Sequence, residues 1–541
     1  MLKANSQLDI LNCPTINFTG TEELLSSDIH IACCEAVTTL PDSLNSHNVT
    51  LRQCKNLKQF PKKRLCIYDR LEISGCHEIK SLPYNHYKYL QDNNVQNPEG
   101  TASYNMRHNE THEGNFISGE IELNNCSGLT HLPDGFSTPD DLMIKSCRNL
   151  DSLPDDLDVD GQLFLSDIPL QTLPRHLKLG RNLILRNVPN LTALPNNIFD
   201  LGPGKYGERT ISLENTGLST EILENLQTID APGIRFQISM PHSKPVETFD
   251  NLHTAWKFWA AHADVKTDCP LLELKQDEIK SLRDYLSQLT STREFTNVKT
   301  KNPLAVRVIN LIEALAKGGE KFKNAVIYQV FSAQASCTDR AILGMDEIET
   351  FIQETKAEQD ALNNDNPISL RTFARQKMLL THVNQLAREH MKTLKAVDEV
   401  EVELAFQIGL REKLGLPGNT SQMKYRRLSG VSDEDIEKAY TTVTQHCDEK
   451  AFEAFLKTYT PWQKYQRMKS TPGFSSLVAL KTENIGSCQL THVNSDQMVL
   501  LGGKQLSYEC LQSQYMNTGR NPYTNQPLDW TTVKRLEKTV E

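Results

Sequence analysis

The sequence lacks a long apolar run, an excess of basic charge and an even set of cysteines. No stretch reaches 18 consecutive apolar residues, so we expect no membrane-spanning helix. The first residues, MLKANSQLDILNCPTINF, lack the apolar core and cleavage site of a secretory signal, so any export is expected to use another route. The net charge of −10 argues against a general nucleic-acid binder. Thirteen cysteines scattered over 541 residues fit a reducing compartment better than a disulfide framework.

The first half of the chain is a repeat array. Leu-Pro or Phe-Pro recurs, with its proline at Pro41, Pro61, Pro83, Pro133, Pro154, Pro174 and Pro195. Each proline ends a unit of the form [ILV]-x-[IL]-x-x-C-x-x-[ILV]-x-x-[LF]-P, as in VTLRQCKNLKQFP. The alternation predicts a short strand, and the proline predicts an extended return segment instead of a full helix. This period indicates a leucine-rich-repeat solenoid with a parallel sheet.

Cysteines recur at one place in the unit, before the proline. They are Cys34, Cys54, Cys76, Cys126 and Cys147. We interpret them as a ladder of buried packing residues, not as metal ligands or redox groups. Two further units place Asp167 and Val188 at the same distance from their prolines.

The longest gap between two of these prolines, from Pro83 to Pro133, holds more than one repeat. The segment from about 84 to 117 is poor in aliphatic residues and rich in Asn, His and Gly. It therefore predicts a loop that leaves the solenoid. Its histidines lack regular ligand spacing, so a solvated loop is favoured over a metal site.

The exposed face of the parallel sheet is expected to bind a protein substrate. Its side chains carry mixed charge with an occasional aromatic ring, which suits a protein partner. The side chains expected to contact the substrate are Arg52, Glu72, Lys145, Phe164 and Arg186, with Glu122, Asn124 and Glu214 beside them.

From about residue 246 the pattern becomes helical and prolines become sparse. Segments such as RVINLIEALAKGGEKFKNAVIYQVF carry apolar residues at three-to-four spacing, which predicts an all-α region to about residue 475. Within it, VFSAQASCTDRAILGM places Cys337 in a short run of small polar residues between apolar helical stretches. A structural cysteine prefers apolar neighbours, so this setting indicates a reactive thiol.

Four blocks in this region together resemble the bacterial novel E3 ligase (NEL) domain of the IpaH-like effectors. Cys337-Thr338-Asp339-Arg340 matches the family's C-x-D-R motif. The blocks VDEVEVELAFQIGLREKLGL, YRRLSGVSDEDI and TPWQKY follow in the family's order. They cover most of residues 300–470, and a preceding leucine-rich-repeat array is also usual in this family. A C-x-D motif alone would be weak, whereas the four blocks together are specific.

The resemblance implies a ubiquitin transferase in which Cys337 takes ubiquitin from a charged E2 as a thioester and passes it to a lysine. Because the attacking species is a thiolate, Arg340 is expected to lower the pKa of the thiol. Asp339 is expected to orient or deprotonate the incoming amine as a general base. The alternative is an ordinary semi-buried cysteine, with Asp339 as a helix cap.

The resemblance also implies that the repeat array restrains the catalytic domain until a substrate binds. The acidic run Asp398, Glu399, Glu401 and Glu403 is characteristic of the family. We interpret it as a solvated or salt-bridged helix face and not as catalytic. The family's usual long charged helical extension after the tryptophan block is missing here.

The residues after about 475 resemble a U-box, the zinc-free relative of the RING domain. The matching blocks are CQLTH, MVLL, SYECLQSQY and NPYTNQPL. Cys488, His492 and Cys510 are too few for the two zinc sites of a RING, so we expect no metal and no cofactor. By position, the E2-binding patch comprises Leu490, Tyr515 and Pro522. The alternative is a small helical element that closes the NEL domain.

The sequence therefore predicts a multidomain protein. The expected parts are an N-terminal cap (1–27), a parallel-β leucine-rich-repeat solenoid (28–245), an all-α NEL-type domain (246–475) and a small α+β U-box-like module (476–541). We expect a thioester-type E3 ubiquitin ligase that a bacterium secretes into the host cytoplasm. Alternatives are a U-box-only scaffold ligase, a non-enzymatic repeat protein, and a cysteine hydrolase that uses His382 or His390 as its base.

Overall fold

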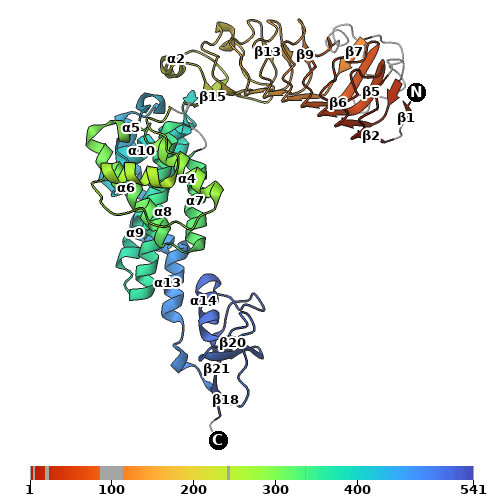
Figure 1. Ribbon diagram of the computed structural model, residues 1–541. Coiled ribbons are helices and arrows are strands. Elements are labelled where there is room, and N and C mark those ends of the chain that lie inside the picture. Colours follow the sequence, from red (N-terminus) through yellow and green to blue (C-terminus); the bar gives the residue numbers. More distant parts are fainter. Residues whose placement is uncertain are drawn as a thin grey trace.

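The computed structural model describes residues 2–3, 6–18, 23–85, 114–240, 244–334 and 337–539. They form three successive parts, a parallel-sheet solenoid, a helical region and a small α+β tail, which confirms the predicted fold class (Figure 1). The helical region lies between the solenoid and the tail. Most of the predicted insertion, residues 86–113, lies outside the described residues. No described helix is both long and apolar enough to cross a membrane.

The solenoid is built on one parallel sheet to which each repeat adds a strand. Its strands are β1 (Leu2–Lys3), β2 (Gln7–Leu11), β3 (Glu23–Leu25), β4 (Asp28–Ala32), β5 (Ser43–Arg52), β6 (Arg64–Ser74), β7 (Gly114–Ile117), β8 (Glu120–Asn124), β10 (Leu142–Lys145), β12 (Leu163–Ser166), β14 (Leu183–Val188), β15 (Arg209–Thr216) and β16 (Ile234–Ser239). A second parallel sheet comprises β9 (Ser137–Thr138), β11 (Asp158–Val159) and β13 (Lys178–Leu179). Helices η1 (Asn196–Ile198) and α2 (Thr220–Asn225) interrupt the last repeats.

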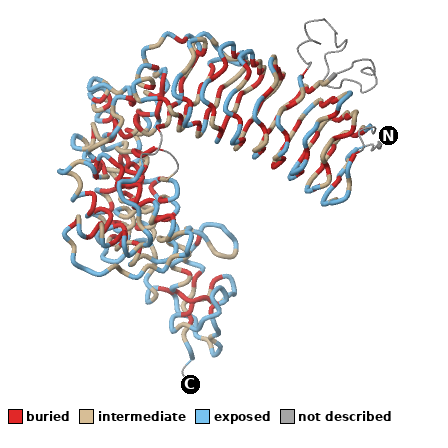
Figure 2. The backbone as a smooth tube through the Cα atoms, turned by 45° about the horizontal axis from the view of Figure 1, so that its top comes forward, coloured by how far each residue is buried: buried red, intermediate tan, exposed pale blue. Residues whose placement is uncertain are grey.

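Alternate strand residues fill the core of the solenoid, as the repeat pattern predicts. Buried residues alternate with less buried ones and recur from turn to turn along the described part of the solenoid (Figure 2). Strand β2 pairs with β4 in parallel, so the repeat geometry already exists in residues 7–11, before the predicted start of the array. Its unit, LDILNCPTI, was missed because no Leu-Pro or Phe-Pro closes it.

The five predicted ladder cysteines are all buried, at 0–1% exposure, which confirms their packing role. The residue before the ladder position repeatedly takes a left-handed conformation, with φ of 52–56° at Asn125, Ser146 and Asp167. Asp167 is therefore the turn residue of its unit and is exposed, and Ile168, 2% exposed, occupies the ladder position. The assignment of Asp167 to the ladder was wrong because this unit is one residue shorter between the ladder and the proline.

The helical region begins after β16, and its helices enclose two apolar cores. Its helices are α3 (Leu252–His262), α4 (Gln276–Leu289), α5 (Arg293–Thr296), α6 (Val298–Lys317), α7 (Glu320–Ala333), α8 (Thr338–Asn364), α9 (Ile368–Met391), α10 (Glu399–Leu414), η2 (Arg426–Ser429), α11 (Asp433–His446), α12 (Glu449–Thr458) and α13 (Thr460–Ser470). Tyr285 and the α8 residues Ile342 and Met345 are fully buried in the first core. Helix α8 therefore begins in the interior of the protein, and this position decides the setting of Cys337.

One short strand of the helical region completes the sheet of the solenoid. Strand β17 (Ala396–Val397) pairs in parallel with β16, and the N–H of Phe236 donates to the carbonyl of Lys395 at 2.7 Å. The side chain of Gln227 accepts from the N–H of Ala396 at 3.2 Å and also donates to its carbonyl. Because an open sheet edge exposes unpaired backbone groups, β17 caps the end of the array. It also leads directly into helix α10.

The tail is a four-stranded sheet with one helix packed on it. Its elements are η3 (Phe474–Ser476), β18 (Ala479–Thr482), β19 (Met498–Leu501), β20 (Lys504–Ser507), α14 (Tyr508–Thr518), η4 (Trp530–Thr532) and β21 (Lys534–Lys538). Cys488, Leu506 and Leu511 lie in a core separate from the helical region. The hydroxyl of Tyr508 donates to the carbonyl of Pro472 at 2.5 Å, which ties the tail to the end of α13.

Candidate active site

Cys337 caps the N-terminus of α8 and is fully buried, at 0% exposure. It belongs to the same apolar cluster as the solenoid core, together with Met240, Ala396 and Leu428. Met240 directly follows β16 at the end of the array, whereas the other two residues belong to the helical region. The thiol therefore lies where the array and the helical region meet.

Three carboxyl groups surround this thiol. Asp339 follows it on α8 and is fully buried. Asp398 is the N-cap of α10 and accepts from the N–H of Val400 at 3.1 Å, and Glu401 lies one turn further along that helix. Asp398 and Glu401 are 1% and 0% exposed, so the interpretation of this acidic run as a solvated helix face was wrong for these two residues.

Burial raises the pKa values of the three carboxyl groups, and repulsion between them adds to the increase for Asp398 and Glu401. Burial raises the pKa of Asp398 to about 7, and burial with the charges of Asp339 and Asp398 raises the pKa of Glu401 well above its usual value. Among the described residues, no N–H or O–H group reaches Asp339 Oδ1 or either oxygen of Glu401. The carboxyls of Asp339 and Glu401 interact with each other, which lowers the pKa of Asp339 and raises that of Glu401.

The pKa of the Cys337 thiol is raised, not lowered as the sequence predicted. Burial is the main cause, and the charges of Asp398 and Glu401 add to it. The guanidinium of Arg340 pairs with Glu347 at 3.0 Å, and only the backbone N–H of Arg340 favours the thiolate. We call the arrangement in which Cys337 is buried between the array and the helical region the closed arrangement. In it the thiol is neutral, and the expected role of the Arg340 side chain was wrong.

Asp339 is held by the loop that connects α10 with η2. Its Oδ2 atom accepts from the N–H of Lys424 at 2.6 Å and from that of Tyr425 at 3.2 Å. Burial raises the pKa of this carboxyl, and the two N–H groups partly offset that increase. The same loop continues into η2, where Tyr425 and Leu428 pack against the solenoid core. The loop therefore contacts the array at one end and the carboxyl of Asp339 at the other.

The end of the array also contacts the carboxyl groups directly. The backbone N–H of Met240 favours the charged form of Asp398. Asp398 itself follows β17, the strand that caps the array. Arg235 of β16 adds a hydrogen bond to the carbonyl of Met391 at 2.6 Å. Movement of the array relative to the helical region would therefore change the surroundings of both the thiol and its carboxyl neighbours.

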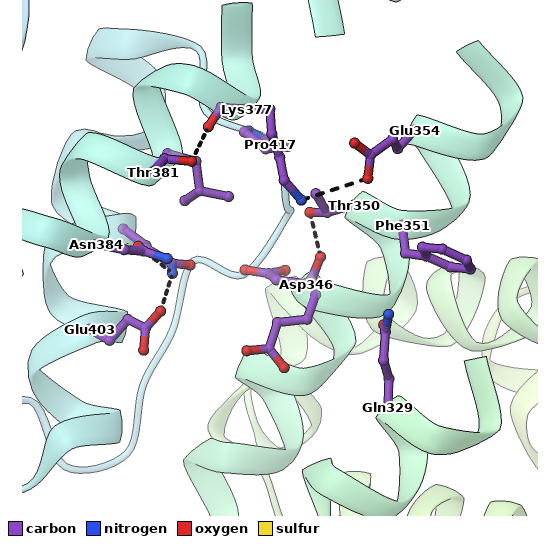
Figure 3. Close-up of a pocket in the computed structure, with 13 residues that line it drawn as sticks. Gln329, Asp346, Thr350, Phe351, Glu354, Lys377, Thr381, Asn384, Glu403 and Pro417 are labelled. Atoms are coloured by element: carbon purple, nitrogen blue, oxygen red, sulfur yellow. Dashed lines mark hydrogen bonds and ion pairs between the residues drawn. The ribbon is translucent and has the colours of Figure 1, made fainter. Parts of the chain in front are cut away.

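A separate pocket of about 320 Å³ lies between α8, α9 and α10 (Figure 3). Glu347, Glu354 and Glu403 line it, and Lys377 forms an ion pair with Glu354 at 3.7 Å across its wall. Burial raises the pKa values of Glu347 and Glu403. The thiol of Cys337 and its three carboxyl neighbours do not line this pocket.

The predicted substrate-contacting residues lie on neighbouring strands of the main sheet, largely paired with one another. Arg52 and Glu72 form an ion pair at 2.7 Å, and Lys145 lies over the ring of Phe164 at 5.3 Å. Arg186 pairs with the neighbouring Glu214 at 2.6 Å. Within this set, Arg52 and Arg186 are the more exposed charges. Their assignment to substrate binding stays a prediction.

The three residues predicted to contact an E2 differ in exposure. Leu490 is 39% exposed in the loop before β19. Pro522 is half-buried, and Tyr515 packs its ring edge-on against Trp530 with the ring centres 5.1 Å apart. Leu490 is thus the member of this set that is clearly available to a partner.

The histidines considered for a hydrolase make other contacts. His382 bonds to the carbonyl of Met378 in its own helix, and His390 lies 3.4 Å from the carbonyl of Gly430 and edge-on to Phe406. The residues that sequence reasoning missed are Asp398 and Glu401. Their signal was present, since VEVELAFQIGL is apolar around nearly the whole helix, and such a helix buries its charged residues too.

Residues 272–471 match the family model described as the C-terminal novel E3 ligase domain that interacts with leucine-rich repeats. The chain is 28% identical over 283 residues to the E3 ubiquitin-protein ligase ipaH3 of Shigella flexneri, an alignment that covers 50% of this chain and 47% of the relative. SspH2 of Salmonella typhimurium is 28% identical over 281 residues, 50% of this chain and 34% of the relative. SlrP of the same species is 24% identical over 300 residues, 52% of this chain and 37% of the relative.

All three relatives are named E3 ubiquitin-protein ligases. The aligned part of this chain spans between a third and a half of the length of each of them. Three findings point to the same similarity. The motif blocks follow the family's order, the family model matches, and the thiol lies against a repeat array. Residues 272–471 of this chain therefore match the novel E3 ligase family model, and the chain is similar to E3 ubiquitin-protein ligases of the IpaH type, in agreement with the resemblance of its motifs.

Proposed function

We propose that the chain is an E3 ubiquitin ligase that carries ubiquitin on Cys337 as a thioester. The main support is one observation: the single cysteine of the C-x-D-R block starts a helix with three carboxyl groups around it. This cluster lies inside the part of the chain that matches the ligase family. Thioester exchange needs a thiol, and transfer to lysine needs a group that accepts a proton from the amine.

The proposed reaction has two steps. The Cys337 thiolate attacks the thioester carbonyl of the E2–ubiquitin conjugate, and the E2 thiolate leaves. A lysine amine then attacks the new thioester, Asp339 accepts a proton from the amine, and the Cys337 sulfur leaves. Asp398 and Glu401 serve this step in two ways. They complete a carboxyl cluster around Asp339, and when ionised they attract the lysine ammonium to the thioester, where Asp339 removes its proton before the neutral amine attacks.

The closed arrangement supports restraint of the transferase by its own repeats. The buried neutral thiol of Cys337 has no path to an E2 thioester, and its pKa disfavours the reactive thiolate. Displacement of β16 from β17 would open that path and hydrate the carboxyl groups. A substrate that binds the array better in the displaced state would supply the energy for this change.

The remaining parts of the proposal concern partners and location. The exposed sheet face around Arg52, Glu72, Lys145, Phe164 and Arg186 would select host substrates. The U-box-like tail would recruit the charged E2 through the patch that includes Leu490, Tyr515 and Pro522. The organisms of the relatives, Shigella and Salmonella, support an effector that is secreted into host cells and acts in the host cytoplasm.

The test is an autoubiquitination assay with E1, E2, ubiquitin and ATP, comparing the wild-type chain with Cys337→Ala. The wild type should form a ubiquitin adduct that a reducing agent removes, and the variant should not. An adduct of this kind that persists in Cys337→Ala would defeat the assignment. A matched control is Cys147→Ala, because Cys147 is an equally buried thiol in the solenoid ladder.

A second candidate is a scaffold ligase that acts through the tail alone. The exposure of Leu490 on a small separate module favours it. It predicts ubiquitin transfer that continues in Cys337→Ala without a thioester intermediate and stops in Leu490→Asp. The leading proposal predicts that Cys337→Ala abolishes transfer whether or not Leu490 is intact.

A further inference from the structure

The loop between α10 and η2, residues 415–425, is held by its own backbone N–H groups. These groups point in chain order at three buried carboxylates from other helices. Asn419 and Thr420 donate to Asp346 at 2.9 and 3.1 Å. Ser421 and Gln422 donate to Glu294 at 2.6 and 2.8 Å. The last two donors, Lys424 and Tyr425, reach Asp339 at 2.6 and 3.2 Å.

We propose that Glu294 is a positioning residue for the transfer of ubiquitin to lysine, because it holds the loop that orients Asp339. This inference rests on the proposed ligase function and adds to it a residue on α5 that lies outside the thiol–carboxyl cluster. The proposal gives Glu294 a different effect on each of the two chemical steps, loading and discharge. Glu294 should matter for the discharge of ubiquitin to an amine and not for the loading of Cys337.

The contacts of Glu294 show why it controls the loop. The side chain is 2% exposed, and its Oε1 atom accepts both N–H groups of Ser421 and Gln422 as well as the Ser421 hydroxyl at 3.2 Å. A leucine at this position would leave these three part-buried donors without their carboxylate acceptor, so the loop would lose the contact that holds it against α5. A glutamine could present its carbonyl oxygen at the same place and keep all three hydrogen bonds.

The next donors along the loop belong to Asp339. Only Met423 separates the Glu294-bound pair from Lys424, so a displaced loop withdraws N–H groups from Asp339 Oδ2. Asp346 anchors the loop before Glu294 and is itself held by Arg307 and Arg411, at 2.6 Å each. It therefore fixes the start of the loop and not the part that touches Asp339. Glu294 is the last anchor before the carboxyl that acts on the amine.

The loop also sets the protonation of Asp339. The groups that face this carboxyl are Glu401 and Asp398 on α10, the N–H groups of Lys424 and Tyr425 with the Lys424 ammonium on the loop, and the Cys337 thiol. Burial raises the pKa of Asp339, whereas the two N–H groups, the Glu401 side chain and the Lys424 ammonium lower it. Loss of the N–H groups would raise this pKa further, so a base that must be ionised would need a higher pH.

The experiment uses the full chain with Gln227→Ala and Arg235→Ala, two changes that weaken the contact between the array and the helical region. In this background we compare Glu294→Leu and Glu294→Gln with the unchanged Glu294. Glu354→Leu is the control, because Glu354 is a poorly exposed glutamate that accepts a hydrogen bond from Tyr459 far along α8 from Asp339. Single-turnover assays measure the loading of Cys337 from charged E2 and its discharge to free lysine.

We expect Glu294→Leu to slow discharge by about tenfold or more and to move its pH profile upward, with loading changed less than about twofold. Glu294→Gln and Glu354→Leu should discharge at the reference rate. The inference is overturned if Glu294→Leu slows both steps equally, if it slows neither, or if Glu294→Gln is as defective as the leucine variant. If the reference chain never forms an adduct on Cys337, the proposed function itself fails.

Hydrogen exchange tests the structural part without any ubiquitin. In Glu294→Leu, the amides of Ser421, Gln422, Lys424 and Tyr425 should lose protection, whereas those of Asn419 and Thr420 should keep it. Glu294→Gln should protect all of them. Continued protection of Lys424 and Tyr425 in the leucine variant would overturn the link between Glu294 and Asp339, whatever the enzymatic result.

Discussion

The contact between the array and the helical region can be weakened at a single side chain. Gln227, after α2, forms two hydrogen bonds with the backbone of Ala396 in β17. Replacing it with alanine removes both and leaves the aliphatic core of the interface intact. We therefore predict that Gln227→Ala increases the fraction of molecules in which β17 and β16 are apart and Cys337 is accessible.

The size of the effect follows from the two hydrogen bonds. Each contributes about 1 kcal/mol net, so the closed state should lose about 2 kcal/mol. Because about 1.4 kcal/mol corresponds to a factor of ten, the open fraction should increase about 30-fold. Arg235→Ala, which removes the hydrogen bond to Met391, should act in the same direction, and the two effects should add when they are independent.

The assay is the alkylation rate of Cys337, followed by mass spectrometry of the peptide that contains it. When closing is fast, this rate is the open fraction multiplied by the rate of the exposed thiol. Gln237→Ala is the matched control, since Gln237 is an exposed side chain on β16. Cys147 in the solenoid core should stay unmodified in every variant. An unchanged Cys337 rate in folded Gln227→Ala would refute this reasoning, and parallel exposure of Cys147 would show unfolding instead of opening.

Three further predictions concern charge, pH and the tail. Arg340→Ala should leave the pH dependence of Cys337 alkylation unchanged, because the guanidinium pairs with the partly exposed Glu347 and not with the thiol. The same change should lower the free energy of unfolding by at most about 1 kcal/mol, measured by thermal unfolding. A shifted pH profile of alkylation would contradict this. The raised pKa of Asp398, about 7, means that closing binds protons, so the closed state should be most stable at low pH and weaken as pH rises from about 4 to about 7. Alkylation corrected for the thiolate fraction should rise across this window, and Asp398→Asn should reduce the rise to the part that Glu401 and Asp339 contribute. A flat wild-type curve would contradict this. Leu490→Asp should weaken E2 binding by about tenfold or more in a titration without altering Cys337 alkylation, and unchanged affinity would remove Leu490 from the patch.

The repeat architecture could be predicted from the sequence because each unit repeats the same local rules. Alternating apolar residues, the ladder cysteines and the proline all act within one unit, and the buried Cys54 and Cys126 follow directly from them. The pattern failed where a unit departs from that spacing, at Asp167 and in the first unit around Cys13. These errors concern register along the chain and leave the fold class unaffected.

The chemistry around Cys337 was less predictable because it depends on contacts between distant segments. The motif predicted a site at Cys337 and Asp339, but the thiol is buried in a cluster with the end of an array that is nearly 100 residues earlier in the chain. The same contact turns Asp398 from an apparent surface charge into a buried neighbour of the thiol. Arg340 was misjudged since proximity in sequence does not show which way a guanidinium points on a helix.

The most direct test of the account is to trap the ubiquitin adduct and identify the residue that carries it. The full chain is incubated with charged E2, quenched without a reducing agent and analysed by mass spectrometry. The account predicts a reducible ubiquitin thioester on Cys337, which increases in Gln227→Ala. A ubiquitin thioester on another of the thirteen cysteines, with Cys337 unmodified, would contradict it.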